Sequence, residues 1–265
     1  MKFTAVGDFL IQEVYKTPYD GFDTLRDFIL RGDARFFNLE TTLNKEGSCC
    51  ASPFSGGSYL RVDPSALDTV KSYGCNMITT ANNHAFDFSY DGFLSTLACL
   101  EQSGLAFAGV GRDLPSAAKP AYLQTKSGTA ALIAVTASLH PTAIAGNPSK
   151  VYAGRPGVNG LRQSEVIEVT AAQMEMLRDI AAETGVNHEA DIDRKDGYLP
   201  ELPAGVFEFA GLTLETAERP GRRVEVNRTD YARIMASIDE AKEKADYVLI
   251  SLHDHSLDGE KENVP

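Results

Sequence analysis

The sequence predicts an α/β protein in which a largely buried sheet is covered by helices on its outside. Short apolar segments rich in β-branched residues alternate with segments of helical periodicity through the first half of the chain. This alternation is typical of right-handed crossover connections between parallel strands. The segment at residues 129–137 is the most apolar of the chain, which predicts a central strand.

Each expected element has a local signal. The expected strands are residues 2–7, 35–39, 77–81, 105–110, 129–137 and 247–252, and the pattern at 206–214 is also consistent with a strand. The expected helices are residues 22–30, 63–73, 90–102, 171–183 and 229–245. Pro64 stands in the first turn of the second helix, where its missing N–H costs nothing. Gly32, Gly74 and Gly104 follow the first three helices, as glycines at helix ends commonly do.

The rhythm of strands and helices breaks between residues 141 and 211. Residues 154–157 read Gly-Arg-Pro-Gly, which is turn chemistry, and residues 187–203 are polar, acidic and interrupted by Pro and Gly. We expect a single domain over residues 1–265 that carries an insertion or lid at about 141–211.

Composition excludes several classes of function. The chain has 265 residues, of which 43% are hydrophobic, and its net charge is -12 without a Lys/Arg cluster, which disfavours nucleic acid and acidic membranes as partners. No apolar stretch approaches about 20 residues, and the N-terminal segment lacks the features of a signal peptide, so we expect no membrane anchor in this chain. The four cysteines form no CxxC pair, which indicates reduced thiols and a cytoplasmic protein.

The stretch at residues 77–91 concentrates polar chemistry at the end of one expected strand. An apolar run stops at Asn82-Asn83-His84, and Asp87 follows shortly after. Asparagine-rich turns after strands are common, so a plain polar turn is the simpler interpretation of this stretch alone. Other strands of the chain end in the same way, which favours a functional site.

Four expected strands end in groups that bind metals. They are followed by Asp8, by Glu40, by Asn83 with His84, and by His253 with His255. The carboxyl ends of parallel strands share one edge of a sheet, so we expect these side chains to converge there. The last two histidines lie two residues apart, so in an extended segment they face the same way.

The donor types predict a hydrolytic metal site. Carboxylate, amide and imidazole ligands without thiolate favour manganese, iron or zinc over a structural zinc site. Glu40 is the preferred bridge between two ions, which would bind an anionic substrate and lower the pKa of a bridging water. An imidazole titrates near neutral pH, so His84 suits proton donation to a leaving group. This combination outlines phosphoester hydrolysis.

Other residues receive weaker assignments. Asp87 is expected to hold an imidazole rather than to bind metal directly. Arg155 and Arg162 would contact an anionic substrate, although many surface arginines have no such role. The simpler alternatives for the predicted ligands are a turn cap at Asp8 and a helix-start carboxylate at Glu40.

Six ordered motifs carry a resemblance to a known family. They are GDF at residues 7–9, FFNLETTL at 36–43, ANNHAFDFSYDGFLSTL at 81–97, GVGRDLPSAAKPAYL at 109–123, GRPGVNGLR at 154–162 and ISLHDHS at 250–256. Together they resemble the CapA family of bacterial capsule-synthesis or poly-γ-glutamate biosynthesis proteins over nearly the whole chain. Each motif alone is weak, whereas the ordered set is specific.

The resemblance implies a calcineurin-like metallophosphoesterase-type fold, a four-layer α/β/β/α sandwich. It implies that Asp8 and Asn83 are metal ligands and that Glu40 replaces a bridging aspartate. His84 then matches the catalytic histidine, and His253, with His255, a later metal histidine.

Two departures from the family pattern stand out. Leu10 occupies the place of a histidine in the first motif. Family members continue into a Gly-His-Gly-Pro-His-like segment and closing strands, so we expect a fold that is incomplete at its C-terminus.

The leading hypothesis is a metal-dependent, phosphoesterase-like hydrolase associated with capsule or poly-γ-glutamate biosynthesis. It would use divalent ions, two of Mn, Fe or Zn, on an anionic small-molecule or polymer substrate, alongside capsule or polyglutamate synthesis proteins. An alternative is a non-catalytic auxiliary or polymer-binding component of a synthesis complex. The third hypothesis is a degenerate fragment that binds no metal.

Overall fold

The computed structural model describes residues 1–14 and 19–256, which fall into two compact units. The first unit contains residues 1–161 together with the described residues from 228 onward, and the second contains residues 162–227. Each unit is described separately below.

The first sheet of the first unit is parallel and carries helices on one face. Its strands are β1 (Phe3–Phe9), β2 (Ala34–Leu39), β5 (Met77–Thr79) and β6 (Ala106–Ala108), in that order. Phe37 and Ile78 point to one face, where they share a core with residues of three helices. These helices are α1 (Phe22–Ile29), α2 (Ala66–Ser72) and α3 (Ser89–Ser103). The strand–helix alternation in the sequence therefore produces this half of the unit.

The second sheet contains β8 (Ala121–Thr125), β9 (Gly128–Thr136) and β15 (Tyr247–His253). Central strand β9 runs antiparallel to β8 and parallel to β15, which confirms the predicted central strand. Its odd-numbered residues, such as Ile133, pack with α7 (Arg228–Lys244). Its even-numbered residues, such as Leu132, pack with Met77 and Ala108 of the first sheet.

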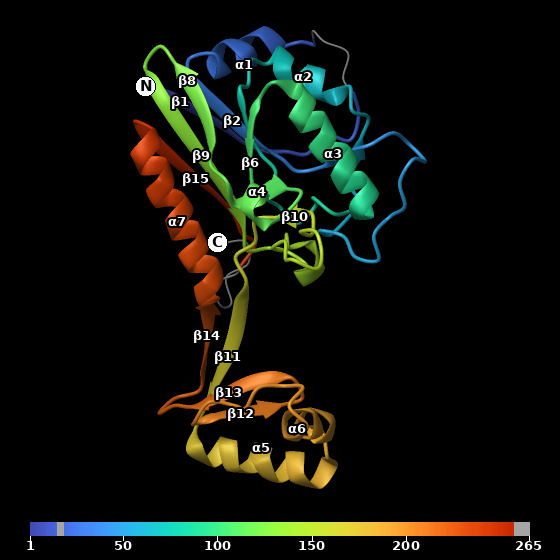
Figure 1. Ribbon diagram of the computed structural model, residues 1–265, viewed down its shortest axis with the longest axis vertical. Helices are drawn as coiled ribbons and strands as arrows, with labels where there is room; N and C mark the ends of the chain where they lie inside the picture. Colours follow the sequence, from blue (N-terminus) through green and yellow to red (C-terminus); the bar gives the residue numbers. More distant parts are fainter. Residues whose placement is uncertain (15–18, 257–265) are drawn as a thin grey trace. The chain divides into compact units, whose positions relative to one another are not determined.

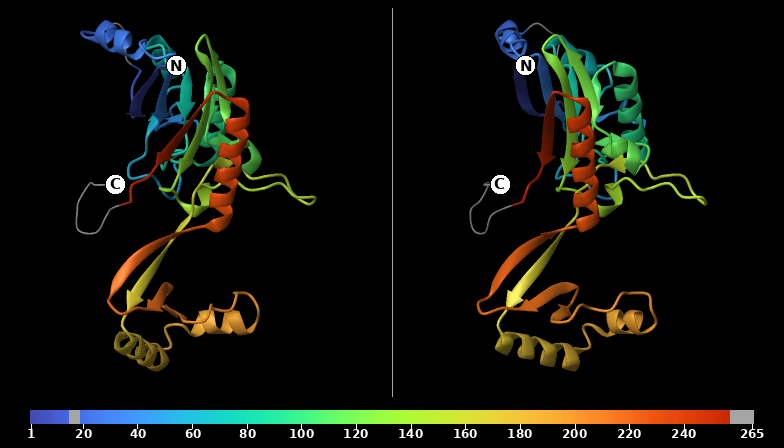
Figure 2. Two further views of the ribbon diagram at one scale, coloured as in Figure 1. Left: turned by 90° about the vertical axis from the view of Figure 1, so that its left-hand side faces the viewer. Right: turned by 60° about the vertical axis from the view of Figure 1, so that its left-hand side comes forward.

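The two sheets therefore face each other and carry their helices on the outer sides, as the blue-to-green and red elements of Figures 1 and 2 show. The predicted mixed α/β class is confirmed. The expectation of one continuous sheet from residue patterns is wrong, because β9 and β15 pair with each other and with β8 rather than with the first sheet. Small side chains such as Ala108, Ala130 and Ala134 let the sheets approach closely.

Short elements hold the loops at the ends of these strands. Strand β3 (Thr42–Leu43) pairs with β4 (Arg61–Val62), and β7 (Val110–Gly111) pairs with β10 (Gly157–Val158). The unit also contains α4 (Leu114–Ala118) and the 3-10 helix η1 (Pro141–Ala143). The β3–β4 pair closes the loop of residues 44–60, which contributes to the site described below.

The second unit is a four-stranded sheet with helices. It contains β11 (Gln163–Val169), α5 (Ala171–Thr184), α6 (His188–Lys195), β12 (Val206–Phe209), β13 (Leu212–Thr216) and β14 (Gly221–Val226), with strand order β12-β13-β11-β14. Val169, Met174 and Leu214 form its small core. Thr170 and Gln173 make a reciprocal capping box at the start of α5.

This unit differs from the expected insertion in two ways. Residues 141–161 belong to the first unit, where β10 pairs with β7, and the second unit continues to residue 227. The prediction of a single strand at 206–214 is wrong. Ala210 and Gly211 adopt positive φ values of 51° and 80° and turn the chain between the two strands β12 and β13. A lid function for this region stays a prediction.

In the part of the chain that the structure describes, no helix combines the length and apolar character needed to cross a membrane. The longest is α7, with 17 residues, and its sequence contains many charged side chains.

Removal of the Arg233 side chain should lower the free energy of unfolding by about 2 kcal/mol, because it removes a charged hydrogen-bond donor from buried polar groups. The Arg233 guanidinium lies 2.7 Å from the carboxylate of Asp230, which is 1% exposed, and donates to Asn159 Oδ1 at 3.1 Å. Urea unfolding of Arg233→Ala measures the loss. Lys244→Ala, which breaks an exposed pair with Glu240, should have a much smaller effect, because exposed ion pairs add little to stability. Equal effects of the two substitutions would contradict the buried role of Arg233.

Candidate metal centre

The ends of β1, β2, β5 and β15 bring most of the predicted site residues together in the first unit. Hydrogen bonds and close polar contacts join the following predicted residues into one cluster: Asp8, Glu40, Asn83, His84, Asp87, His253 and His255. Three of the strands belong to the first sheet and β15 to the second. The expected convergence along one sheet edge is therefore corrected to a convergence between two facing sheets.

His253 is the centre of the donor cluster. Its Nε2 lies 2.7 Å from Asn83 Oδ1 and 3.0 Å from His255 Nε2. The same nitrogen lies 3.5 Å from Glu40 Oε1. Ligand atoms of Glu40, His253 and His255 all lie within 4.8 Å of one another. Two ligands that each bind one ion at about 2.0–2.1 Å lie about 3 Å apart, so these spacings fit a shared cation.

A network of buried amides supports the cluster from below. Asn38 Nδ2 donates to Asp8 Oδ1 at 2.8 Å and lies 3.3 Å from His253 Nδ1. Asn82 Nδ2 donates in turn to Asn38 Oδ1 at 3.0 Å. Neither amide was among the predicted site residues, although Asn38, as an asparagine inside an apolar strand, carries a usable signal. Asn38 orients Asp8 and His253 together.

Asp87 holds the ring of His84. The carboxylate is fully buried and lies 2.7 Å from His84 Nδ1. It also accepts the N–H groups of Gly56 at 3.0 Å and Leu60 at 2.7 Å. The other ring nitrogen of His84 lies 3.9 Å from Glu40 Oε1, on the side of the donor cluster. His84 is thereby presented with a fixed orientation.

The electrostatics of the cluster follow from the burial of Glu40, His84 and His253 and from the charges around them. Burial opposes a charge on His84, but the hydrogen bond and charge of Asp87, with the charge of Glu40, raise the pKa of His84 above its usual value. Burial and the neighbouring Asp8 raise the pKa of Glu40 to about 7. Burial lowers the pKa of His253, and His255 and His84 add to this effect. A neutral imidazole beside crowded carboxylates is suited to bind a cation.

Glu40 should make the metal-free protein less stable as the pH rises. Its pKa of about 7 in the folded protein exceeds the ordinary 4.5, so the folded state binds more protons between these values and loses stability from pH 4.5 to 7. Glu40→Gln should therefore stabilise the metal-free protein at pH 8 by on the order of 2–3 kcal/mol and have little effect at pH 4. Urea unfolding in chelator measures both values. Glu46→Gln, at a side chain that is 93% exposed, is the control, and equal shifts for both variants would contradict this origin.

The two predicted substrate arginines belong to different units. Arg155 is exposed, and its Nε donates to the carbonyl oxygen of Ile144 at 3.1 Å. Arg162 begins the second unit, where its carbonyl oxygen accepts the N–H of Asn227 at 2.9 Å. Contact of either arginine with a substrate stays a prediction.

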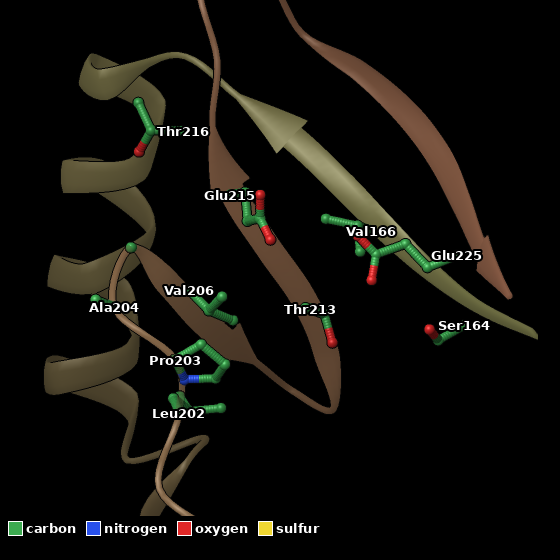
Figure 3. Close-up of a pocket in the computed structure, with 11 residues that line it drawn as sticks. Ser164, Val166, Leu202, Pro203, Ala204, Val206, Thr213, Glu215, Thr216 and Glu225 are labelled. Atoms are coloured by element: carbon green, nitrogen blue, oxygen red, sulfur yellow. The ribbon is translucent and has the colours of Figure 1, made fainter. Parts of the chain in front are cut away.

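A separate pocket of about 500 Å³ lies within the second unit, on the sheet face that Figure 3 shows. Glu215 and Glu225 line it, together with Ser164, Val166 and the segment 202–206. Arg223 lies 2.8 Å from Glu215 and 2.9 Å from Glu225, so both carboxylates already form ion pairs with its guanidinium. This pocket contains none of the predicted site residues.

Comparison with known proteins identifies the family. The family described as "Bacterial capsule synthesis protein PGA_cap" matches residues 2–263. The chain belongs to this family. The resemblance to the capsule-synthesis family found in the sequence motifs is thereby confirmed.

The relatives that the chain matches are longer than the chain. The uncharacterized proteins y4sH and y4uA of Sinorhizobium fredii are each 28% identical over 257 residues, which cover 95% of this chain and 53% of the relative. A Mycobacterium tuberculosis protein named "Probable polyglutamine synthesis accessory protein" is 30% identical over 92 residues, or 34% of this chain and 23% of the relative. The chain thus spans about half the length of the first two relatives.

Proposed function

We propose that this member of the capsule synthesis family is a metal-dependent phosphoester hydrolase that acts in capsule or poly-γ-glutamate metabolism. The observation that carries the proposal is the meeting of Glu40, His253 and His255 within 4.8 Å. The imidazole of His84, which is held by the Asp87 carboxylate, lies beside them. The two facing sheets with outer helices support the metallophosphoesterase-like reading of the fold.

The donor set fits divalent cations of the manganese, iron and zinc group. Asp8, Glu40, Asn83, His253 and His255 would hold one or two ions through carboxylate, amide and imidazole atoms. When bound, such ions attract the anionic group of a substrate and make a bound water more acidic. Asn38 and Asn82 orient these ligands through hydrogen bonds.

His84 supplies the proton for the leaving group. In phosphomonoester hydrolysis a water oxygen bonds to phosphorus, the bond from phosphorus to the leaving oxygen breaks, and that oxygen takes a proton. Asp87 fixes Nδ1 of His84, so the Nε2 proton is directed toward the cluster. The raised pKa of His84 keeps this proton available near neutral pH.

A second candidate is a non-catalytic auxiliary or polymer-binding component of a synthesis complex. The observation that favours it is the word "accessory" in the name of the Mycobacterium tuberculosis relative. In that case the same donors would bind a cation together with an acidic polymer, without bond cleavage, and capsule or polyglutamate synthesis proteins would be the partners.

Metal content and hydrolysis separate these candidates. Purified protein incubated with Mn²⁺, Fe²⁺ or Zn²⁺ should retain metal and hydrolyse p-nitrophenyl phosphate, and a chelator should remove both properties reversibly. His253→Ala should retain less metal than the parent protein, whereas His188→Ala, in the second unit, should retain the same amount. Metal retention without hydrolysis of any phosphomonoester would favour the auxiliary role, and no retention would overturn the metal site.

A further inference from the structure

A hollow of about 470 Å³ opens directly beside the donor cluster. It is lined by the segments 54–56 and 138–140 together with Asn83 and His255, two members of the cluster. Its volume lies within the range typical of small-molecule sites. A substrate whose anionic group lies at the cluster would therefore extend into this hollow.

Two stacked rings form one wall of the hollow. Phe54 and His140 lie with ring centroids 3.9 Å apart and planes inclined by 13°. The His140 ring is held by a hydrogen bond between Nδ1 and Thr142 Oγ1 at 2.7 Å. Phe54 also packs against the helix-side core of the first sheet. The wall therefore presents a fixed aromatic surface.

The same carboxylate that holds His84 fixes this wall. The Asp87 carboxylate accepts the N–H of Gly56, and the backbone carbonyl oxygen of Asp87 accepts the N–H of Ser52 at 2.9 Å. The side chain of Asn83 donates to the carbonyl oxygen of Gly56 at 2.7 Å. The loop that carries Phe54 is thus tied on both sides to the donor cluster, so the hollow and the cluster form one preorganised site.

The chemistry of the lining selects an uncharged group. Among the described residues that line the hollow, none is Asp, Glu, Lys or Arg. Ser55 and Ser138 offer hydroxyl groups, whereas Phe54 and Leu139 offer apolar surface. A charged group would lose hydration here without gaining an ion pair. An uncharged ring could stack on the aromatic wall, and any hydroxyl groups on it could hydrogen-bond to the serines.

We propose that this hollow is the leaving-group pocket and that it selects phosphomonoesters of uncharged, ring-sized alcohols. Phe54 and His140 determine this specificity. The inference rests on the proposed hydrolase function and adds the class of substrate to it.

The test uses the full Mn²⁺-loaded chain with three phosphomonoesters and inorganic phosphate. The parent protein should favour benzyl phosphate, an alkyl ester with an uncharged ring, over phosphocholine and phosphoserine, alkyl esters that carry charged groups, by at least tenfold in kcat/KM. Phe54→Ala and His140→Ala should each raise the KM for benzyl phosphate about tenfold and change kcat little. The inhibition constant of inorganic phosphate, which lacks a leaving group, should stay unchanged.

The control is Tyr152→Ala, which removes an aromatic ring that is 66% exposed in the same unit and should change neither constant. His140 is exposed, so its variant keeps the test decisive if Phe54→Ala fails to fold. An unchanged KM in the folded variants, or no preference for the uncharged ester, would overturn the pocket while the hydrolase function stands. A parent protein that neither hydrolyses these esters nor binds inorganic phosphate in calorimetry would overturn both.

Discussion

The His84→Ala variant should hydrolyse a simple alkyl phosphomonoester about a thousandfold more slowly than the parent protein, but p-nitrophenyl phosphate only about tenfold more slowly. An alkoxide leaves poorly without a proton, whereas p-nitrophenolate is stable as an anion. His84 is the group that would supply this proton, because its Nδ1 is fixed by Asp87 at 2.7 Å and its Nε2 points toward the cluster. Steady-state rates on the two esters measure the difference.

Metal content distinguishes this role from that of a ligand. His84→Ala should retain the same amount of metal as the parent protein, since its Nε2 lies 3.9 Å from Glu40 Oε1 and the closest donor contacts belong to His253. Asp87→Asn should move the alkaline limb of the pH–rate profile on the alkyl ester to lower pH, because the neutral amide supports the imidazolium less well and His84 loses its proton earlier. Equal losses on both esters, or a loss of metal, would contradict the role of His84 as an acid.

The positions of the donor groups along the chain could be predicted because their signal is local. Asp8, Glu40 and His84 each follow an apolar run. A polar residue at the end of such a run can be recognised without knowing which strands pair with it. The assignment of strands to sheets could not be predicted in this way. Strand β9 is buried on both faces, so its pattern fits the centre of any sheet, and only its pairing with β8 and β15 decides which one.

Much of the second unit could not be predicted for a different reason. Strand β14 reads GRRVEV and is mostly exposed, so it lacks the apolar character that identifies strands in a sequence. Its stability depends on cross-strand contacts, such as Arg223 with Glu168 at 3.2 Å, between residues 55 positions apart. Helix α6 has no fully buried residue, so the polar segment that forms it resembles a loop.

The supporting parts of the candidate site depend on contacts that are remote in sequence. Asn38 meets His253 across 215 positions, and Gly56 meets Asn83 across 27. A residue whose role is to orient another residue leaves no periodic pattern, so only the folded arrangement identifies it. These residues are therefore where substitution tests the site most directly.

Gly56→Ala should reduce hydrolysis at least a hundredfold and weaken metal binding, although residue 56 offers no side chain to the cluster. A Cβ at this position would lie 2.6 Å from Nδ2 and 2.9 Å from the backbone carbon and oxygen of Asn83. Backbone atoms cannot rotate away, so Asn83 must shift, and its Oδ1 would leave its position 2.7 Å from His253 Nε2. Loss of an orienting contact typically weakens metal affinity about 10- to 100-fold. Metal titration and the rate on p-nitrophenyl phosphate measure the two effects.

Gly57→Ala is the matched control, because the two substitutions add the same methyl group to adjacent residues of one loop. Gly57 has a φ of 138°, so an alanine there is strained, but its Cβ would meet no atom within 4 Å. This variant should lose stability in urea unfolding while it keeps its metal affinity, whereas Gly56→Ala should lose affinity beyond any loss of stability. If both variants lose metal affinity in proportion to their loss of stability, the loop acts only through folding, and the close packing of Gly56 on Asn83 does not position the metal site.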